Sequence, residues 1–314
     1  MPEGDVTVTS AFKTPATPPA FKTQNLVLSG AIGVNFYLDL SMLSEEEKTG
    51  SYMTFEISGK GTTTPRDDID EGFKNSKGYY GFTCYVNAAQ MADTITATYH
   101  YGDGLTVSKE YSIEQYLTTF DDYINSFTEK QRTMTKAMAD YGHYVQLFLA
   151  QSNQWTLGTD YAAMNHYYAQ TYDIAEVRSA VESYAAVLGT NEDIEKVSFT
   201  LVLDSETAIK VYIKPASGYT GNITATVGSS TVNAAELQDD GRYMVRIPKI
   251  SAHKLGITYT VKVTTDSGTA VTKVSGLSYV QMLLNHEAYA NNSVAQNAMA
   301  SIYYYYKAAY ELKQ

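Results

Sequence analysis

The sequence has a single cysteine. Cys84 stands alone among 314 residues, so no disulfide can form within the chain. It lies in the run 80–86, Tyr-Gly-Phe-Thr-Cys-Tyr-Val, whose alternation predicts a strand in which Cys84 packs as a small apolar side chain. Scarce cysteine suits a cytosolic protein and equally a surface protein of an anaerobe, so the compartment stays open.

Clusters of positive charge and long hydrophobic runs are also lacking. The chain has 23 Lys and Arg against 34 Asp and Glu, which gives a net charge of −11. No basic run is present that could neutralise nucleic-acid phosphates or attach the chain to an anionic membrane surface. The longest apolar runs are too short to cross a bilayer. We therefore expect a soluble globular protein that neither binds nucleic acid nor inserts into a membrane.

Catalytic signatures are missing as well. The sequence has no G-x-S-x-G, no Gly-rich phosphate loop ending in Lys-Ser/Thr and no H-E-x-x-H. The five histidines lie far apart without metal-ligand spacing, and His143 is expected to pack beside a Tyr-rich helix. We expect no catalytic residues, no metal and no cofactor. A glycoside hydrolase of unfamiliar type, which needs two facing carboxylates, is the least favoured alternative.

The first residues have the composition of a linker. Residues 1–23 are rich in Thr, Pro and Ala, and Pro15, Pro18 and Pro19 interrupt any regular element. They contain no charged-then-apolar signal pattern. We expect the chain to be a fragment of a longer secreted protein.

The two halves of the chain resemble each other. In each half, apolar and polar residues alternate in short runs that are separated by Gly turns, which is typical of β-hairpins. The matching segments are 26–34 with 201–211, 77–80 with 240–243, 95–99 with 259–263, and the turns 102–104 with 266–268. The pattern predicts an internal duplication.

Both halves become helical after their strands. Segment 112–117 corresponds to 278–283, and a longer helix follows each. Those helices open with Thr128 and Ser293, each followed three residues later by Gln, which is the spacing of a capping box. Residues 160–188 also have helical periodicity and are expected to connect the halves.

These patterns predict an α+β fold. It consists of two tandem antiparallel β-sandwich-like units, each followed by a helical hairpin. The expected boundaries are a linker at 1–23, the first unit at 24–151, a helical connector at 152–196 and the second unit at 197–314.

Tyrosine is unusually abundant, with 28 residues against one tryptophan. A Tyr ring has an apolar face and a hydroxyl that donates and accepts, so exposed Tyr side chains suit sugar rings. Most of the 28 are expected to be structural. Binding residues concentrate at turns, and the candidates are Tyr79, Tyr80, Tyr99, Tyr101, Asp103, Trp155 and Tyr219. Trp155 could equally seal the junction between the first unit and the connector.

The strand 33–38, Gly-Val-Asn-Phe-Tyr-Leu, and the helix 139–146, Ala-Asp-Tyr-Gly-His-Tyr-Val-Gln, resemble a duplicated module of large secreted surface proteins of anaerobic gut Firmicutes. Some of these are similar to components of starch-adherence assemblies. The resemblance implies an extracellular, cell-surface location and non-catalytic binding of α-glucan such as starch. Starch-binding modules usually stack glucose between two aromatic rings, so Tyr would supply the second ring here.

One alternative from a different functional class remains open. Duplicated sandwiches also serve as structural or adhesive modules that bind another cell-surface protein and no sugar. An exposed apolar patch would favour that alternative over a Tyr-lined groove.

Overall fold

The computed structural model describes eleven stretches of the chain. They are 17–27, 32–57, 62–63, 67–68, 72–91, 93–113, 115–116, 126–151, 171–203, 207–228 and 235–314. Trp155 and residues 152–170 of the expected connector lie outside them, as do residues 1–16 of the expected linker.

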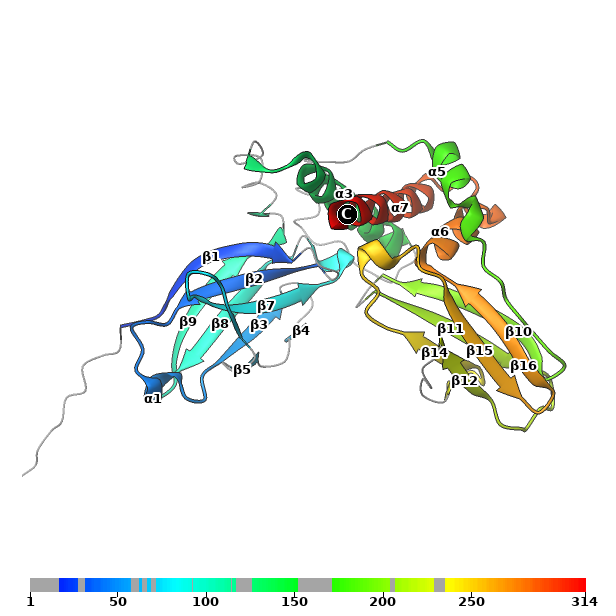
Figure 1. Cartoon of the computed structure of the whole chain (residues 1–314), viewed down its shortest axis with the longest axis horizontal. Helices are drawn as coiled ribbons and strands as arrows, with labels where there is room; N and C mark the ends of the chain where they lie inside the picture. The colour runs from blue at the N-terminus through cyan, green and yellow to red at the C-terminus, as the bar shows by residue number, and fades with distance from the viewer. Residues whose placement is uncertain are drawn as a thin grey trace, which may run out of the picture.

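The N-terminal β-unit contains two antiparallel sheets that face each other (Figure 1). The first has the order β1 (Ala20–Val27), β2 (Ile32–Asp39), β7 (Tyr80–Val86), β6 (Phe73–Lys74). The second has the order β4 (Thr62–Thr63), β3 (Tyr52–Ile57), β8 (Ile95–Tyr101), β9 (Leu105–Tyr111), with β5 (Asp67–Asp68) also paired to β3. Short helices α1 (Glu45–Lys48) and η2 (Ala88–Gln90) join the strands. Phe36 and Phe55 connect the two sheets, with ring centroids 5.7 Å apart.

The C-terminal β-unit has a similar construction. One sheet has the order β10 (Ile194–Val202), β11 (Ala208–Pro215), β14 (Tyr243–Ile247), β13 (Glu236–Leu237). The other has the order β12 (Thr224–Val227), β15 (Tyr259–Thr265), β16 (Gly268–Val274), and the short helix η5 (Ala252–Lys254) precedes β15. Val211 of the first sheet and Val261 and Val263 of the second are fully buried in the core.

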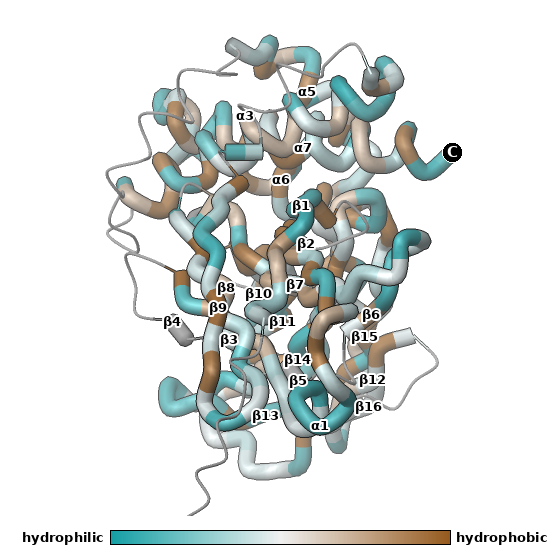
Figure 2. Tube along the Cα trace, turned by 90° about the vertical axis from the view of Figure 1, so that its left-hand side faces the viewer, coloured by the Kyte–Doolittle hydropathy of each residue, from teal (hydrophilic) through white to brown (hydrophobic). Residues whose placement is uncertain are grey.

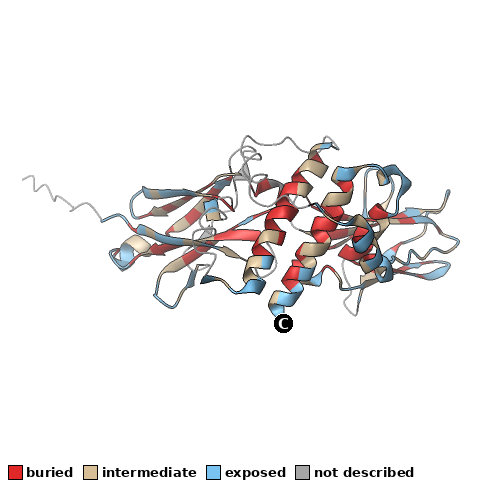
Figure 3. Cartoon of the chain, turned by 90° about the horizontal axis from the view of Figure 1, so that it is seen from above, coloured by how far each residue is buried: buried red, intermediate tan, exposed pale blue. Residues whose placement is uncertain are grey.

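The longer helices form one layer beside the strands (Figure 2). They are α3 (Glu129–Gln151), α5 (Ile174–Val181), α6 (Gly276–Leu284) and α7 (Ser293–Lys313), with the 3-10 turns η4 (Glu182–Tyr184) and η6 (Glu287–Tyr289). Viewed from above, α3 and α7 lie side by side with their buried faces together (Figure 3). The rings of Tyr141 and Tyr305 stack across this contact, 4.8 Å apart. Within the described part of the chain, no helix is both long and apolar enough to span a membrane.

Several predictions made from the sequence are confirmed. The fold is α+β with antiparallel sheets, and segments 26–34 and 201–211 each contain a strand pair, with Leu26 opposite Val34 and Leu201 opposite Ile209. Cys84 is buried in β7. The capping box at Thr128 is also present. The Thr128 N–H donates to Gln131 Oε1 at 2.9 Å, and the Gln131 N–H donates to the Thr128 hydroxyl at 3.3 Å.

Three details differ from the prediction. Residues 20–23 belong to strand β1 and not to the linker, because they pair with β2 despite the neighbouring prolines. Strand β10 begins at Ile194, inside the expected connector. The expected capping box at Ser293 is wrong, since Asn292 caps α7 by accepting the Ala295 N–H at 3.0 Å. Gln296 instead donates to the carbonyl oxygen of Tyr289 at 3.0 Å.

The buried phenols between α3 and α7 predict a loss of stability in alkali. Burial raises the pKa of Tyr305 well above its usual value of about 10. Above pH 10 the unfolded chain therefore loses this proton while the folded chain keeps it, so the free energy of unfolding falls as pH rises. One such phenol contributes a slope of about 1.4 kcal/mol per pH unit. Urea unfolding between pH 8 and 11.5 should show a shallower fall for Tyr305→Phe.

Ile302→Val provides the matched control, because Ile302 is buried in the same helix and has no titrating group. It should lower the free energy of unfolding by about 1 kcal/mol at every pH and leave the slope unchanged. A slope for Tyr305→Phe equal to that of the wild type would contradict the prediction.

Candidate functional site

The structure places two of the candidate tyrosines inside the core. Tyr99 is 0% exposed, and its hydroxyl lies 2.7 Å from Ser51 Oγ. Its ring stacks on that of Tyr101, which is also buried, at 6.0 Å. The expectation that these two rings are exposed is therefore wrong. The reason is the alternation of β8, in which Tyr99 and Tyr101 share the inward face with Ile95 and Ala97.

The other candidates divide between the two units. Tyr79 and Tyr80 are half-buried at the start of β7, and Lys74 Nζ lies 4.5 Å from the centroid of the Tyr80 ring. Asp103 is exposed in the turn between β8 and β9. Tyr219 belongs to the C-terminal unit, where its hydroxyl donates to the Asn222 carbonyl oxygen at 3.1 Å and accepts the Asp266 N–H at 3.3 Å.

These candidates do not gather into one platform. Tyr219 ties the loop after β11 to the turn between β15 and β16, which is a structural task. The ring of Tyr80 has a cation over its face. Trp155 lies outside the described residues. The structure therefore brings Tyr79, Tyr80 and Asp103 to the N-terminal unit and leaves Tyr219 on the other unit.

The outer face of the β1-β2-β7-β6 sheet holds a set of residues that the sequence analysis missed. Alternate residues of β7 point to opposite sides of the sheet. Phe82 and Cys84 are buried, so Thr83 and Tyr85 point outward. We call this surface the N-terminal sheet face, and its residues are Asn25, Gly33, Asn35, Tyr37, Phe73, Gly81, Thr83 and Tyr85.

Two exposed aromatic rings lie on the N-terminal sheet face. Tyr85 is 57% exposed and Phe73 is 41% exposed. Phe73 packs edge-on against Tyr37, with centroids 5.6 Å apart, over Gly81. A Cβ at Gly81 would lie 2.6 Å from Phe73 Cζ, and one at Gly33 would lie 3.1 Å from Tyr85 Cδ1. The two glycines thus let aromatic rings lie close to the backbone of the neighbouring strands.

A row of hydrogen-bonded polar side chains separates the two rings. Asn35 Nδ2 donates to Asn25 Oδ1 at 2.8 Å, and Thr83 Oγ1 donates to Asn35 Oδ1 at 2.6 Å. Phe73 pairs with Gly81 of β7, four residues from Tyr85, so the two rings rise from positions about 13 Å apart along the strand. The surface therefore presents ring, amide and hydroxyl groups, then ring, along one direction.

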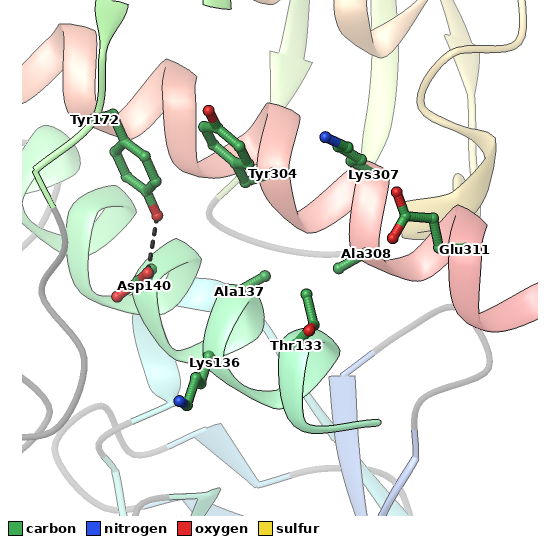
Figure 4. Close-up of a pocket in the computed structure, with 9 residues that line it drawn as sticks. All are labelled: Thr133, Lys136, Ala137, Asp140, Tyr172, Tyr304, Lys307, Ala308 and Glu311. Atoms are coloured by element: carbon green, nitrogen blue, oxygen red, sulfur yellow. Dashed lines mark hydrogen bonds between the residues drawn. The ribbon is translucent and has the colours of Figure 1, made fainter. Parts of the chain in front are cut away.

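A groove lies between α3 and α7 (Figure 4). Its volume is about 340 Å³, and its lining residues are Thr133, Lys136, Ala137, Asp140, Tyr172, Tyr304, Lys307, Ala308 and Glu311. The Tyr172 hydroxyl donates to the buried Asp140 Oδ2 at 2.9 Å, and its ring stacks on Tyr304 at 5.0 Å. Burial, and then the Asp140 charge, raise the pKa of Tyr172. Asp140 of α3 and Tyr304 of α7 thus both contact Tyr172 and hold it against the two helices.

No metal-binding geometry is found in the part of the chain that the structure describes: no three or more His, Cys, Asp and Glu side chains there could jointly hold an ion.

The sequence matches no model of a protein family, and it matches no curated protein.

The contrast between the buried Tyr99 and the exposed Tyr85 predicts different costs for removing their hydroxyls. Tyr99→Phe loses the contact with Ser51 in the core, so the free energy of unfolding should fall by about 1 kcal/mol. Tyr85→Phe should change it by less than about 0.5 kcal/mol, because its side chain is mostly in solvent. Urea denaturation of both variants measures the difference. Equal costs would contradict the assignment of Tyr99 to the core and Tyr85 to the surface.

Proposed function

We propose that this chain is a non-catalytic, extracellular module that binds polysaccharide on the N-terminal sheet face, with α-glucan such as starch as the favoured ligand. The observation that carries the proposal is the pair of exposed rings, Tyr85 and Phe73, on either side of the polar row of Asn25, Asn35 and Thr83. The choice of α-glucan and of a cell-surface parent protein rests on the resemblance in sequence to starch-adherence components.

The chemistry of the face suits a sugar chain. A pyranose ring has an apolar C–H surface that can lie on an aromatic ring, and hydroxyl groups that need donors and acceptors at its edge. The exposed Asn25 amide and the half-buried Thr83 hydroxyl supply such groups between the rings. An open face of a sheet accommodates a polymer that continues in both directions, and binding at such a shallow surface is weak at a single site and is strengthened by multivalency.

We also propose that the two halves arose by duplication. The supporting observation is the connection order of the strands. One sheet of the N-terminal unit has the order β1, β2, β7, β6. The corresponding sheet of the C-terminal unit has the order β10, β11, β14, β13. The triplet β3-β8-β9 corresponds in the same way to β12-β15-β16, and a long helix, α3 or α7, follows each unit.

An exposed apolar strip favours the alternative function, that of an adhesive module that binds a protein. Val187, Leu188 and Val271 are exposed, and Val187 exchanges two backbone hydrogen bonds with Lys273 of β16 at 2.9 and 2.7 Å. The strip therefore lies along the edge of the β12-β15-β16 sheet. Exposed apolar side chains at a sheet edge are typical of protein contacts.

Removal of either exposed ring tests the sugar proposal. The purified chain should be retained by insoluble starch and retarded in native gels that contain amylopectin, without release of reducing sugar. Tyr85→Ala and Phe73→Ala should each weaken binding roughly two- to twelvefold, since one aromatic contact contributes about 0.5–1.5 kcal/mol. Tyr310→Ala is the matched control, because Tyr310 is similarly exposed but lies on α7. It should bind as the wild type does.

Three outcomes would overturn the proposal. Failure of the wild-type chain to bind starch, cellulose or xylan would exclude the sugar function and favour the protein-binding strip. Retention that Tyr85→Ala and Phe73→Ala leave unchanged would exclude this face as the site. Release of reducing sugar would show that the chain is an enzyme.

A further inference from the structure

The outer face of the β10-β11-β14-β13 sheet is basic, although the chain as a whole is acidic. Val211 and Ile213 of β11 are buried, so Lys210, Tyr212 and Lys214 point outward. Similar alternation on the neighbouring strands adds further cations to this side. We call this surface the basic sheet face, and its cations are Lys196, Lys210, Lys214, Arg242 and Arg246.

Strand register arranges these cations in two rows. Lys210 lies opposite Arg246 in one row. Lys214 lies opposite Lys196 in the other row. Arg242 also belongs to this row: Tyr243 pairs with Ile213, so the preceding residue Arg242 lies next to Lys214. The rows are four residues apart on β11, or about 13 Å.

A row without cations, with Glu236 at its edge, separates the two cationic rows. It contains Ser198, Tyr212 and Met244, which lie opposite one another on β10, β11 and β14. The Arg242 guanidinium lies 4.4 Å from the centroid of the Tyr212 ring and is thereby held over it. The basic sheet face therefore offers cations at two levels with hydroxyl groups and an aromatic ring between them.

Two of these five cations form salt bridges with acidic residues. Glu195 pairs with Lys214 at 2.6 Å, and Asp240 pairs with Arg242 at 2.6 Å. The four side chains of these pairs are between 39% and 52% exposed, so solvent screens both pairs and an anionic ligand can compete for the cations. Glu236 lies opposite Met244 at the edge of the sheet.

We propose that the basic sheet face binds an anionic polysaccharide whose sugars carry carboxylate groups. This goes beyond the proposed function, because it uses a different surface and a ligand of different charge. Lys and Arg side chains bind carboxylates by charge-assisted hydrogen bonds. The Ser198 hydroxyl, which lies on the outward side of β10 between the charged rows, pairs with a sugar hydroxyl.

The geometry favours a sugar polymer over an acidic peptide. Peptides commonly bind to sheets by adding a strand at an edge, where backbone N–H and C=O groups are open. The cations here lie over the middle of the sheet, where the backbone groups of β11 already bond to β10 and β14. A peptide on this face would gain contacts through its carboxylates but none for its own backbone.

Affinity electrophoresis tests the proposal with polygalacturonate and with the same polymer after methyl esterification, which removes its charge. The full chain should bind polygalacturonate at low salt and bind it more weakly as the NaCl concentration rises. It should not bind the methyl-esterified polymer. The double variant Lys210→Glu and Arg246→Glu should weaken binding at least about tenfold, because it places like charges against the ligand. Lys262→Glu with Lys273→Glu makes the same change on the opposite sheet and should bind normally.

The milder Lys210→Gln, with its fold checked by circular dichroism, should show a smaller loss in the same direction, which separates binding from misfolding. Tyr85→Ala should bind polygalacturonate normally, so failure of starch binding and failure of this proposal are distinguishable. Absence of polygalacturonate binding at low salt would overturn the proposal. An equal loss of polygalacturonate binding in the control double variant would also overturn it. Poly-glutamate binding as tight as polygalacturonate binding would overturn it too, because that result would indicate an acidic protein partner.

Discussion

The antiparallel contact between α3 and α7 determines how the rest of the molecule is arranged. Each helix follows its own β-unit in the chain, and the two meet where the buried rings of Tyr141 and Tyr305 stack. Burial of a side chain of this size stabilises the fold by about 1.5–3 kcal/mol. Alanines at the contact let the helices approach closely enough for Tyr141 and Tyr305 to stack. This contact is the broadest one between the described elements of the two units, and it involves neither the exposed Tyr85 on the outer face of the β1-β2-β7-β6 sheet nor the exposed Lys214 on that of the β10-β11-β14-β13 sheet.

Tyrosine serves two purposes that composition cannot separate. In Tyr99, Tyr141 and Tyr305 the ring fills space in a core or between helices, and in Tyr219 the hydroxyl closes a loop. Only exposure, as at Tyr85, leaves the face of a ring available to a ligand. The abundance of Tyr therefore indicates many positions that are apolar on one side and polar on the other, and a binding surface is a small subset of them.

The sequence predicted the hairpins, the strand pairs and the order of elements, because Gly turns and period-2 alternation are local signals. It also contained the information that corrects Tyr99 and Tyr101: both have the parity of Ile95 and Ala97 in β8, which indicates the inward face. A position beside a turn favours exposure, but in this strand the alternation decides which side chains are buried. The N-cap of α7 could not be predicted from the sequence. Asn292 and Ser293 are both good caps, and only the backbone shows which one is used.

The two sheet faces needed the structure for a different reason. Lys210, Lys214 and Arg246 come from two strands, so no basic run marks them in the sequence. Phe73 reaches the same face as Tyr85 only through the pairing of β6 with β7. A surface on a sheet is assembled by register across strands, and register depends on long-range pairing. A further signal was present in the chain: Gly33 and Gly81 within alternating runs mark places where a ring approaches the backbone.

The arrangement of the two units decides what binding at both faces would achieve. In Figure 1, β1 and β2 lie in front of β8 and β9, whereas β15 and β16 lie in front of β11. The N-terminal sheet face and the basic sheet face therefore point to opposite sides of the molecule. One stiff polymer cannot lie on both faces at once, so the two sites would not add their affinities for a single chain in the way that neighbouring sites do. They would instead hold two different polymers together, a neutral one and an acidic one, with the α3–α7 contact as the link between the two units.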